Sequence, residues 1–571
     1  MSIRSIGLAP GLACALLAAS GCKRDSAADA APKATQPSLQ AQTVAQLHWL
    51  GMDGVARETN ATNFMSIWHE PESRKLLSQT LDKLAGWMTE VSKPAATNSS
   101  PAQKPSLQST VRNSPLRPLL DDLVQDECYV EVRQVPNGPG NLAFAIRLNP
   151  EHAALWETNL ALAVETAIGT RPASAQGTYG WQVDLHRTDS GGQGSPGPAR
   201  FLSLSRSGDW TILGLSQGSQ PAPVPEGFPP PPSATNFWIA ANFDLARISQ
   251  ALGLDWKLPA NTPRVSLNAI GDGENVISHG DLTFAQPLPM TLGSWKLPTN
   301  LIHGPLVSLV AARGLAPWLG QLTLFSNFPP ANLPDQFYMW GRYGLPSQLY
   351  YALPIADATD ALNMLAGPIT NSANPKIQPN NGSIALDTTQ EVLSWTGLPH
   401  AQPFLKAVTD SNPQLLYGGF APELHPQPMP PELRDHILEA TNLAYFNWEV
   451  TGEMLLYWRY LDDVYRIAFD NSGPRLSGTA SLKWLAANTT NFSHTVTEAR
   501  LEAPTLVSFV RKSTIGVNSL ELEALANWLE LPQFPHGLSQ IIYTNPAPSY
   551  TQLIKLKHQR HKLPPQTPAQ H

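Results

Sequence analysis

The sequence predicts an α+β protein made of repeated strand-helix-strand-strand units, which form antiparallel sheets with helices packed on one face, preceded by a small helical arm. Three observations predict this class. Apolar residues alternate with polar ones over residues 142–148, as in a half-buried strand. Asn149 and Pro150 then form a helix start signal, and Gly169 is a stop signal. The run over residues 201–215 folds back at Gly208 as a hairpin.

This order of elements recurs, which divides the body of the chain into four units. We expect unit 1 over residues 115–218, unit 2 over 236–330, unit 3 over 331–410 and unit 4 over 411–554, the last with an added strand and helix. Helices begin after Asp244 in unit 2 and near Asp357 in unit 3. In unit 4 we expect a helix over 431–440 and strands over 443–450 and 454–459. Hairpins dominate and long parallel crossovers are few, so the sheets should be antiparallel.

Residues 44–91 are expected to form the helical arm. Apolar residues recur there at spacings of four and three, which places them on one helix face: Leu77, Leu81, Leu84, Met88 and Val91. The segments between folded parts are small, polar and rich in proline. They are a tether over 23–43, linkers over 92–114 and 219–235, and a basic tail over 555–571, which we expect to be solvated.

The N-terminal segment up to Cys22 has the organisation of a secretory signal. Arg4 is the positive charge, residues 6–19 are an apolar run too short to span a bilayer, and small residues lead into Cys22. This end of the signal resembles the lipobox of bacterial lipoproteins, although Ala19 stands where that motif usually has leucine. The resemblance implies that Cys22 is lipidated and holds the protein on the cell envelope, with the periplasmic face of the outer membrane favoured over the inner membrane. An ordinary cleaved signal is the alternative.

Composition excludes several classes of partner. The net charge of −7 gives no basic footprint for nucleic acid and no electrostatic attraction to anionic lipid. Contact with a membrane should therefore be through the N-terminal lipid. Of the three cysteines, processing removes Cys14 and uses Cys22, which leaves Cys128 as a small apolar core residue without a disulfide partner.

No catalytic or metal-binding motif is complete. Residues 214–218 match G-x-S-x-G around Ser216, but the proline-rich segment that follows cannot be the helix that this nucleophile motif requires. Glu432, His436 and Glu439 share a helix face and could hold a metal, although surface helices carry such trios routinely. We therefore expect no metal, cofactor or catalytic residues.

Two further groups of polar residues have weaker patterns. His279 and Asp281 share a strand face without a nucleophile, and Asp462 and Asp463 would point to opposite faces of a strand. The glycine-rich residues 190–197 lack the lysine of a phosphate-binding loop.

Aromatic residues cluster in two regions, over residues 337–351 and 445–460. Consecutive aromatics on a strand cannot all face one core, so some of them would line a cleft. Packing between the sheet and its helices is the simpler interpretation. The clusters are Phe337, Tyr338, Trp340, Tyr343, Tyr350 and Tyr351, and Tyr445, Phe446, Trp448, Tyr457, Trp458 and Tyr460.

Three short stretches resemble a family of uncharacterised exported lipoproteins from environmental bacteria. They are HWLGMD over 48–53, TNATNFMSIW over 59–68 and QTLDKLA over 79–85, together 23 of the 571 residues. The resemblance supports export to the envelope and implies no activity and no site.

Together these observations favour a membrane-anchored lipoprotein that binds a partner or has a structural role, and not an enzyme. Two alternatives stay open. One is an envelope hydrolase that acts on glycan or lipid with carboxylates about 5–10 Å apart in an aromatic-lined cleft. The other is a carrier of an apolar ligand, which would require a continuous apolar cavity between sheet and helices.

Overall fold

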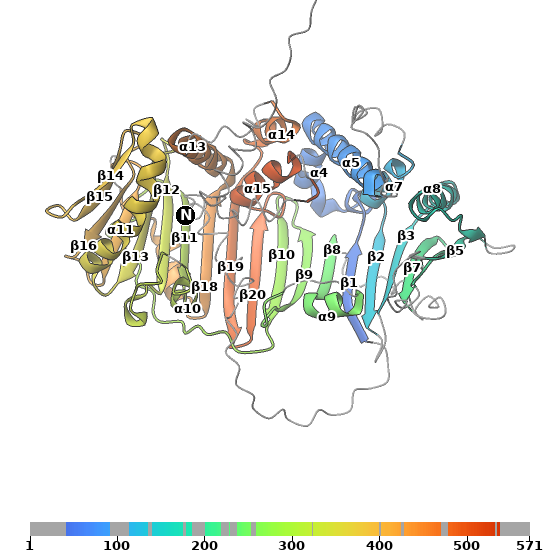
Figure 1. Ribbon diagram of the computed structural model, residues 1–571, viewed down its shortest axis with the longest axis horizontal. Helices are drawn as coiled ribbons and strands as arrows, with labels where there is room; N and C mark the ends of the chain where they lie inside the picture. Colours follow the sequence, from blue (N-terminus) through green and yellow to red (C-terminus); the bar gives the residue numbers. More distant parts are fainter. Residues whose placement is uncertain are drawn as a thin grey trace, which may run out of the picture.

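A single antiparallel sheet runs through the whole protein. The computed structural model describes residues 42–91, 114–134, 140–174, 179–185, 200–217, 228, 237–252, 258–322, 324–398, 401–423, 427–469, 478–531 and 534–536. Within these residues 20 strands form the sheet, and Figure 1 shows them side by side with most helices on one side. Cys22, the expected signal and tether, the glycine-rich loop at 190–197 and the basic tail lie outside the described residues.

The strand pairs give the order β4-β5-β6-β7-β3-β2-β1-β8-β9-β10 for the first half of the sheet and β20-β19-β18-β11-β12-β13-β17-β16-β15-β14 for the second, with β10 paired to β20 at the centre. The first ten strands are β1 (Gln42–Trp49), β2 (Cys128–Gln134), β3 (Asn141–Arg147), β4 (Ala173–Ser174), β5 (Trp181–Asp184), β6 (Arg200–Ser207), β7 (Trp210–Gln217), β8 (Ile239–Asp244), β9 (Arg264–Gly271) and β10 (Val276–Thr283). The second ten are β11 (Leu306–Arg313), β12 (Gln336–Arg342), β13 (Leu349–Ile355), β14 (Ser383–Asp387), β15 (Val392–Thr396), β16 (Phe404–Val408), β17 (Gln414–Gly419), β18 (Leu443–Val450), β19 (His494–Ala503) and β20 (Leu506–Ser513).

The two halves have the same topology, because each strand of the first half corresponds to the strand ten places later. Their registers correspond as well. The β1–β2 ladder shifts between Thr43 and Ala45, and the β11–β12 ladder shifts between Leu306 and Ser308, at the matching place. At the centre of the sheet, the equivalent strands β10 and β20 pair with each other in antiparallel fashion. An approximate twofold axis passes through the pair His279–Val510 and relates the residue pairs on either side of it. The described chain is therefore a tandem pair of ten-stranded units.

The helices occupy the connections between strands. After β1 come α3 (Met52–Val55), α4 (Thr62–His69), α5 (Pro71–Val91) and α7 (Arg117–Gln125), and α8 (Pro150–Ile168) and α9 (Leu245–Leu252) follow β3 and β8. In the second half α10 (Ala316–Leu319) follows β11, α11 (Ala358–Ile377) follows β13, α12 (Pro431–Glu439) follows β17, α13 (Thr451–Phe469) and α14 (Ala480–Asn488) follow β18, and α15 (Ser519–Leu529) follows β20. Short 3₁₀ helices are η1 (Thr59–Ala61), η2 (Pro330–Asn332) and η3 (Gln378–Asn380). None of the helices in the described part of the chain has the length and apolar character that crossing a membrane requires.

The expected fold class is wrong in its architecture. The strands make one sheet and not a series of small sheets, and the repeat comprises ten strands and not four elements. The helical arm is also not separate, because residues 42–49 are strand β1, which lies between β2 and β8 inside the sheet. Both errors have one cause: alternating apolar residues identify a strand but say nothing about partners that lie far away along the chain.

Most local predictions are confirmed. Asn149 caps α8 by accepting a hydrogen bond from the His152 N–H, and Gly169 ends this helix with φ +70°. Asp244 and Asp357 cap α9 and α11 in the same way. The segment at 454–459 is wrong, because it belongs to α13 and not to a strand.

The second half is covered on both faces of the sheet. On one face α13 and α15 pack through Met454, Trp458 and Leu520. On the other, α12 and residues 295–302 cover Tyr338, Trp340 and Tyr350, which have no exposed surface. The first half is covered by the described helices on only one face, and there only in part. The part of that face that the described helices leave open contains the candidate site.

Candidate functional site

An apolar trough crosses the helix-facing side of the sheet where the two halves meet. Its residues form two rows, each of which follows the pairing register through β1, β8, β9, β10 and β20. Because side chains alternate along a strand, rows two residues apart lie on the same face. The rows are Leu47, Ala241, Leu267, Gly280 and Phe509, and Ala45, Phe243, Val265, Leu282 and Val507.

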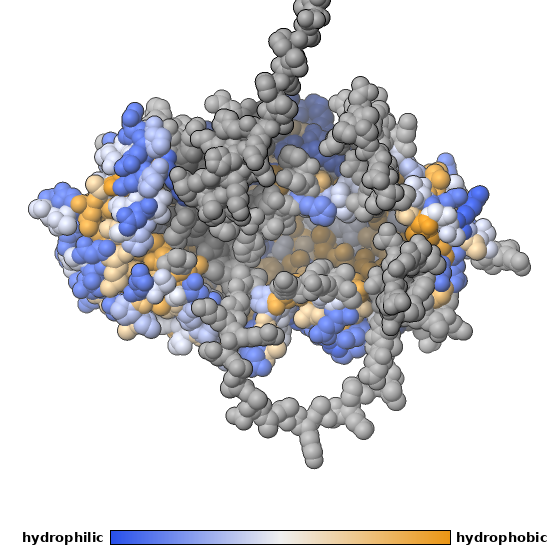
Figure 2. Space-filling model, in the orientation of Figure 1, coloured by the Kyte–Doolittle hydropathy of each residue, from blue (hydrophilic) through white to orange (hydrophobic). Residues whose placement is uncertain are grey.

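The trough is bordered by helices but is not filled by those that the structure describes. At one border Phe64 and Met65 of α4 pack, together with Trp49, against the cluster around Trp238, and at the other Ile248 and Leu252 of α9 pack near Ala45. Between these borders the side chain of Leu47 is 38% exposed, and Ala241, Phe243 and Leu267 are half-buried. Figure 2 shows apolar side chains in the recess between α9 and the helices above it.

Gly280 makes room for the ring of Phe509, its neighbour in the row. A Cβ atom at this position would come within 2.3 Å of the Phe509 ring, so the ring lies directly over the glycine backbone. The trough floor therefore consists of aliphatic side chains, aromatic rings and bare backbone. None of the ten floor residues has a side chain that donates or accepts a hydrogen bond.

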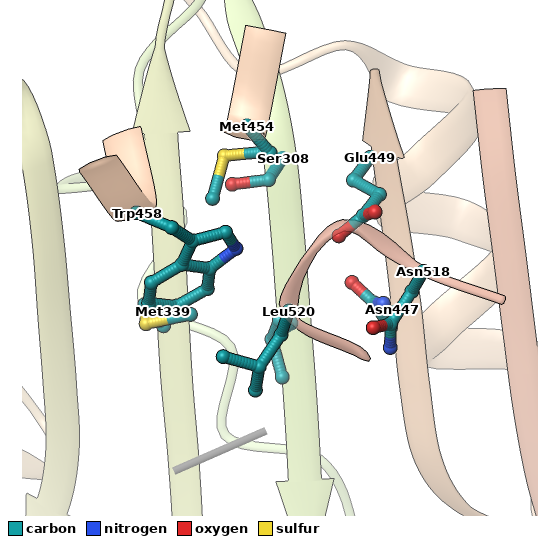
Figure 3. Close-up of a pocket in the computed structure, with 9 residues that line it drawn as sticks. Ser308, Met339, Asn447, Glu449, Met454, Trp458, Asn518 and Leu520 are labelled. Atoms are coloured by element: carbon teal, nitrogen blue, oxygen red, sulfur yellow. The ribbon is translucent and has the colours of Figure 1, made fainter. Parts of the chain in front are cut away.

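The corresponding place in the second half is a small cavity lined by both polar and apolar side chains. The pairing register of β1 with β8 corresponds to that of β11 with β18. Ala45, Leu47, Ala241 and Phe243 of the first half are therefore equivalent, in this order, to Ser308, Val310, Asn447 and Glu449 of the second. These four residues line a cavity, under α13 and the start of α15, with about 10 Å³ for the centre of a water molecule, room for one. Figure 3 shows Met339, Met454 and Trp458 on one side of it and Glu449, Asn447 and Asn518 on the other.

Hydrogen bonds fix this cavity. The carboxylate of Glu449, a residue only 4% exposed, accepts from the Ser519 N–H at 2.6 Å and from the Ser519 hydroxyl at 3.0 Å. Trp458 Nε1 donates to the same hydroxyl at 2.9 Å. Burial raises the pKa of Glu449, partly offset by these hydrogen bonds. Asn447, 2% exposed, has a side-chain oxygen without a hydrogen-bond partner among the described residues.

Besides the buried aromatic residues around Trp340, the opposite face of the sheet carries three His–Glu–Arg clusters, one of which joins Glu423 to His303 Nδ1 at 3.0 Å and to Arg342 at 3.2 Å. In the second, Glu127 contacts His48 Nε2 at 3.1 Å and Arg147 at 2.7 Å, and His48 stacks on Tyr129. In the third, Glu498 contacts His436 Nε2 at 2.8 Å and Arg500 at 2.6 Å. Each glutamate thus joins a histidine to an arginine in an ion-pair network.

The structure separates the sequence candidates for catalysis. His436 contacts Glu498 of β19, whereas Glu432 and Glu439 of the expected trio are exposed on α12. Ser216 is a buried residue inside β7, paired with Phe201, and not on a strand-to-helix turn.

The remaining pairs do not form a site either. His279 and Asp281 do share a face of β10, where they lie exposed opposite Asn268 and Ser266. Asp462 and Asp463 lie on α13, so the expectation that they point to opposite faces of a strand is wrong.

Most of the clustered aromatics belong to the core, the simpler of the two interpretations. Trp340, Tyr350 and Tyr417 stack across β12, β13 and β17 with ring centroids 5.8 to 6.0 Å apart. Tyr343 is the exception and is 64% exposed after β12. These three rings pack the sheet against α12, whereas Trp458 of the second aromatic cluster lines the small cavity beside Glu449.

One group in the described part of the chain has the geometry of a metal site. Ligand atoms of Asp122, Asp126 and His152 lie within 4.8 Å of one another, where α7 meets α8. Both oxygens of Asp122 already accept hydrogen bonds, from His152 Nδ1 at 2.8 Å and from Trp156 Nε1 at 2.7 Å. These hydrogen bonds give the group a structural role, because they join Asp122 of α7 to two residues of α8.

Sequence reasoning missed the trough. The apolar alternation over 239–243 and 264–271 was visible, but which face of each strand would stay uncovered was not. Comparison of the chain with protein-family models, with curated proteins and with solved structures finds no match. The function is therefore inferred from these residues alone.

Proposed function

We propose that the protein is an exported, lipid-anchored binding module of the cell envelope and that the trough is its binding surface. The observation that carries this proposal is the pair of apolar rows on the helix-facing side of the sheet, with Leu47 exposed. Apolar surface left in water is unfavourable by about 25 cal/mol for each Å². An apolar recess that the described helices leave uncovered, beside recesses that they cover, is therefore typical of a surface that receives a partner.

The N-terminal sequence supports the cellular place of this module. A lipid on Cys22 and the tether over 23–43 would hold the sheet near a bilayer while leaving it free to reorient, since about 20 flexible residues reach roughly 25 Å. In this position a binding surface can meet partners on the envelope without entering the membrane.

The anchor is tested by labelling cells with a fatty-acid analogue. We expect label on the wild-type protein and none on Cys22→Ala, with the variant released from the membrane fraction. Label on both proteins, or on neither, contradicts lipidation at this residue.

The binding surface is tested with an apolar dye, anilinonaphthalene sulfonate. We expect its fluorescence to rise on the wild-type protein and to fall clearly in a Leu47→Thr/Leu267→Thr variant, because threonine keeps the β preference while adding a hydroxyl group. Val510→Thr is the matched control, since Val510 is 41% exposed on the opposite face. Equal dye fluorescence in all three proteins contradicts the proposal.

A further inference from the structure

We propose that the partner received by the trough is an amphipathic α-helix of another protein, which binds through its apolar face. This inference rests on the proposed function of the trough. It comes from the internal duplication, because the second half shows what covers the same face of the sheet there.

In the second half that cover is helical. Met454, Tyr457 and Trp458 of α13 pack with Val310 and Met339 in one buried cluster. Val310 is the register equivalent of Leu47. In the first half the corresponding connection after β8 starts with α9, which is only eight residues long and lies at the border of the trough. Among the described residues, the first half therefore lacks the helix that the second half has.

The trough is also continuous with this established interface. Val507, at the end of one row, belongs to the buried cluster that contains Tyr457 and Trp458, and Phe509, at the end of the other row, packs against it together with Leu282. A helix lying in the trough would extend that layer of helices along the sheet.

The dimensions fit a helix better than a single extended chain. The two rows are two residues apart, which is about 7 Å along the strands. A helix with side chains is about 10–12 Å wide and covers both rows, whereas one acyl chain covers a single row. Five strands at about 4.8 Å span about 19 Å, or about 13 residues of helix, and the open part is shorter because Val507 at the β20 end is only 2% exposed.

The chemistry of the floor defines the face of that helix. Under α15 the polar Glu449 is satisfied by the N–H and hydroxyl groups of Ser519. Its register equivalent in the trough is Phe243, which offers no hydrogen bond. A polar group of the partner buried there would stay unsatisfied, so the docking face should be wholly apolar. Leucines at helical spacing are the expected pattern.

The experiment uses the full-length protein and two fluorescein-labelled peptides of about 18 residues. One has leucines spaced by three and four with lysine and glutamate elsewhere; the other has the same composition in scrambled order. We expect the patterned peptide to bind, with a rise in anisotropy and in helical circular dichroism. Leu47→Thr/Leu267→Thr should weaken this binding about tenfold or more, and Val510→Thr should leave it within about twofold.

A fluorescent fatty acid, parinaric acid, is measured in parallel. If it binds in a manner that depends on Leu47 and Leu267 while the patterned peptide does not, the trough is a binding surface but the helix inference is overturned. If the scrambled peptide binds as well as the patterned one, the inference is overturned too. If neither probe responds to the two trough substitutions, the proposed function itself fails.

Discussion

Asp126 should make the stability of the protein depend on pH, and Asp126→Asn should remove that dependence. This carboxyl group follows α7, and burial together with the neighbouring carboxylates of Asp122 and Asp53 raises its pKa to about 6 from 3.8, although His152 acts in the opposite direction. The native protein therefore keeps a proton that the unfolded chain releases near pH 4. Between about pH 4 and 6 the native state binds more protons, so the free energy of unfolding falls as the pH rises.

The size of the effect follows from the difference between the native and the unfolded pKa. A difference of about two pH units corresponds to about 3 kcal/mol at about 1.4 kcal/mol for each unit. Asp126 is only half-buried, so screening by solvent should reduce this to about 1–2 kcal/mol. Asparagine has nearly the same shape and cannot ionise. We expect Asp126→Asn to be about as stable as wild type near pH 4 and to gain about 1–2 kcal/mol over wild type near pH 8.

The measurement is urea unfolding at several pH values, followed by tryptophan fluorescence, with a metal chelator present. Trp156 gives a local signal because it donates a hydrogen bond to Asp122. Asp281→Asn is the matched control, an exposed aspartate on β10. A difference between Asp126→Asn and wild type that is the same near pH 4 and pH 8 would refute this reasoning.

Three further substitutions test the second half. Glu449→Gln keeps an oxygen to accept from the Ser519 N–H but replaces the oxygen that accepts from the Ser519 hydroxyl with an NH2 group. Because burial raises the pKa of Glu449, the variant should gain stability relative to wild type as pH rises above about 4.5, as measured by urea unfolding; Glu439→Gln, on the exposed side of α12, should not. Trp340→Ala should lose about 3–5 kcal/mol, because this ring is fully buried in the stack; a loss below about 1 kcal/mol would show that it lines open space. Asn518→Ala should cost about 1 kcal/mol, since Asn518 and Glu521 form a capping box at the start of α15, and unchanged thermal unfolding would contradict that role.

Elements specified by neighbouring residues were predictable. The hairpin of β9 and β10 closes at Gly273, which has φ +99° and therefore favours glycine. Asn149 and Gly169 mark both ends of α8 because caps depend only on a few adjacent residues. The failure at 454–459 is also informative. Tyr457 and Trp458 have β-forming side chains, yet these residues belong to a helix whose buried face packs on the sheet.

The candidate site was not predictable in this way. Ala45, Ala241 and Leu267 come from distant parts of the chain and become neighbours only through the pairings of β1, β8 and β9. Their alternation was visible, but an apolar strand face reads the same whether a helix covers it or not. The difference between the trough and the Glu449 cavity depends on α13, which has no counterpart of similar length after β8 in the described part of the chain.

Where most strands, turns and helix ends form could be worked out from the amino-acid sequence, because each depends on side chains a few residues apart. The sequence also contains the signal-like N-terminus and Cys22, on which the expected anchor depends. The tertiary structure was needed to show that all described strands join one sheet, that the sheet is a tandem pair of ten-stranded units, and that the described helices leave one apolar face uncovered. The physical reason is that backbone hydrogen bonds between strands are the same for any partner. Partner choice and coverage therefore depend on packing over the whole chain.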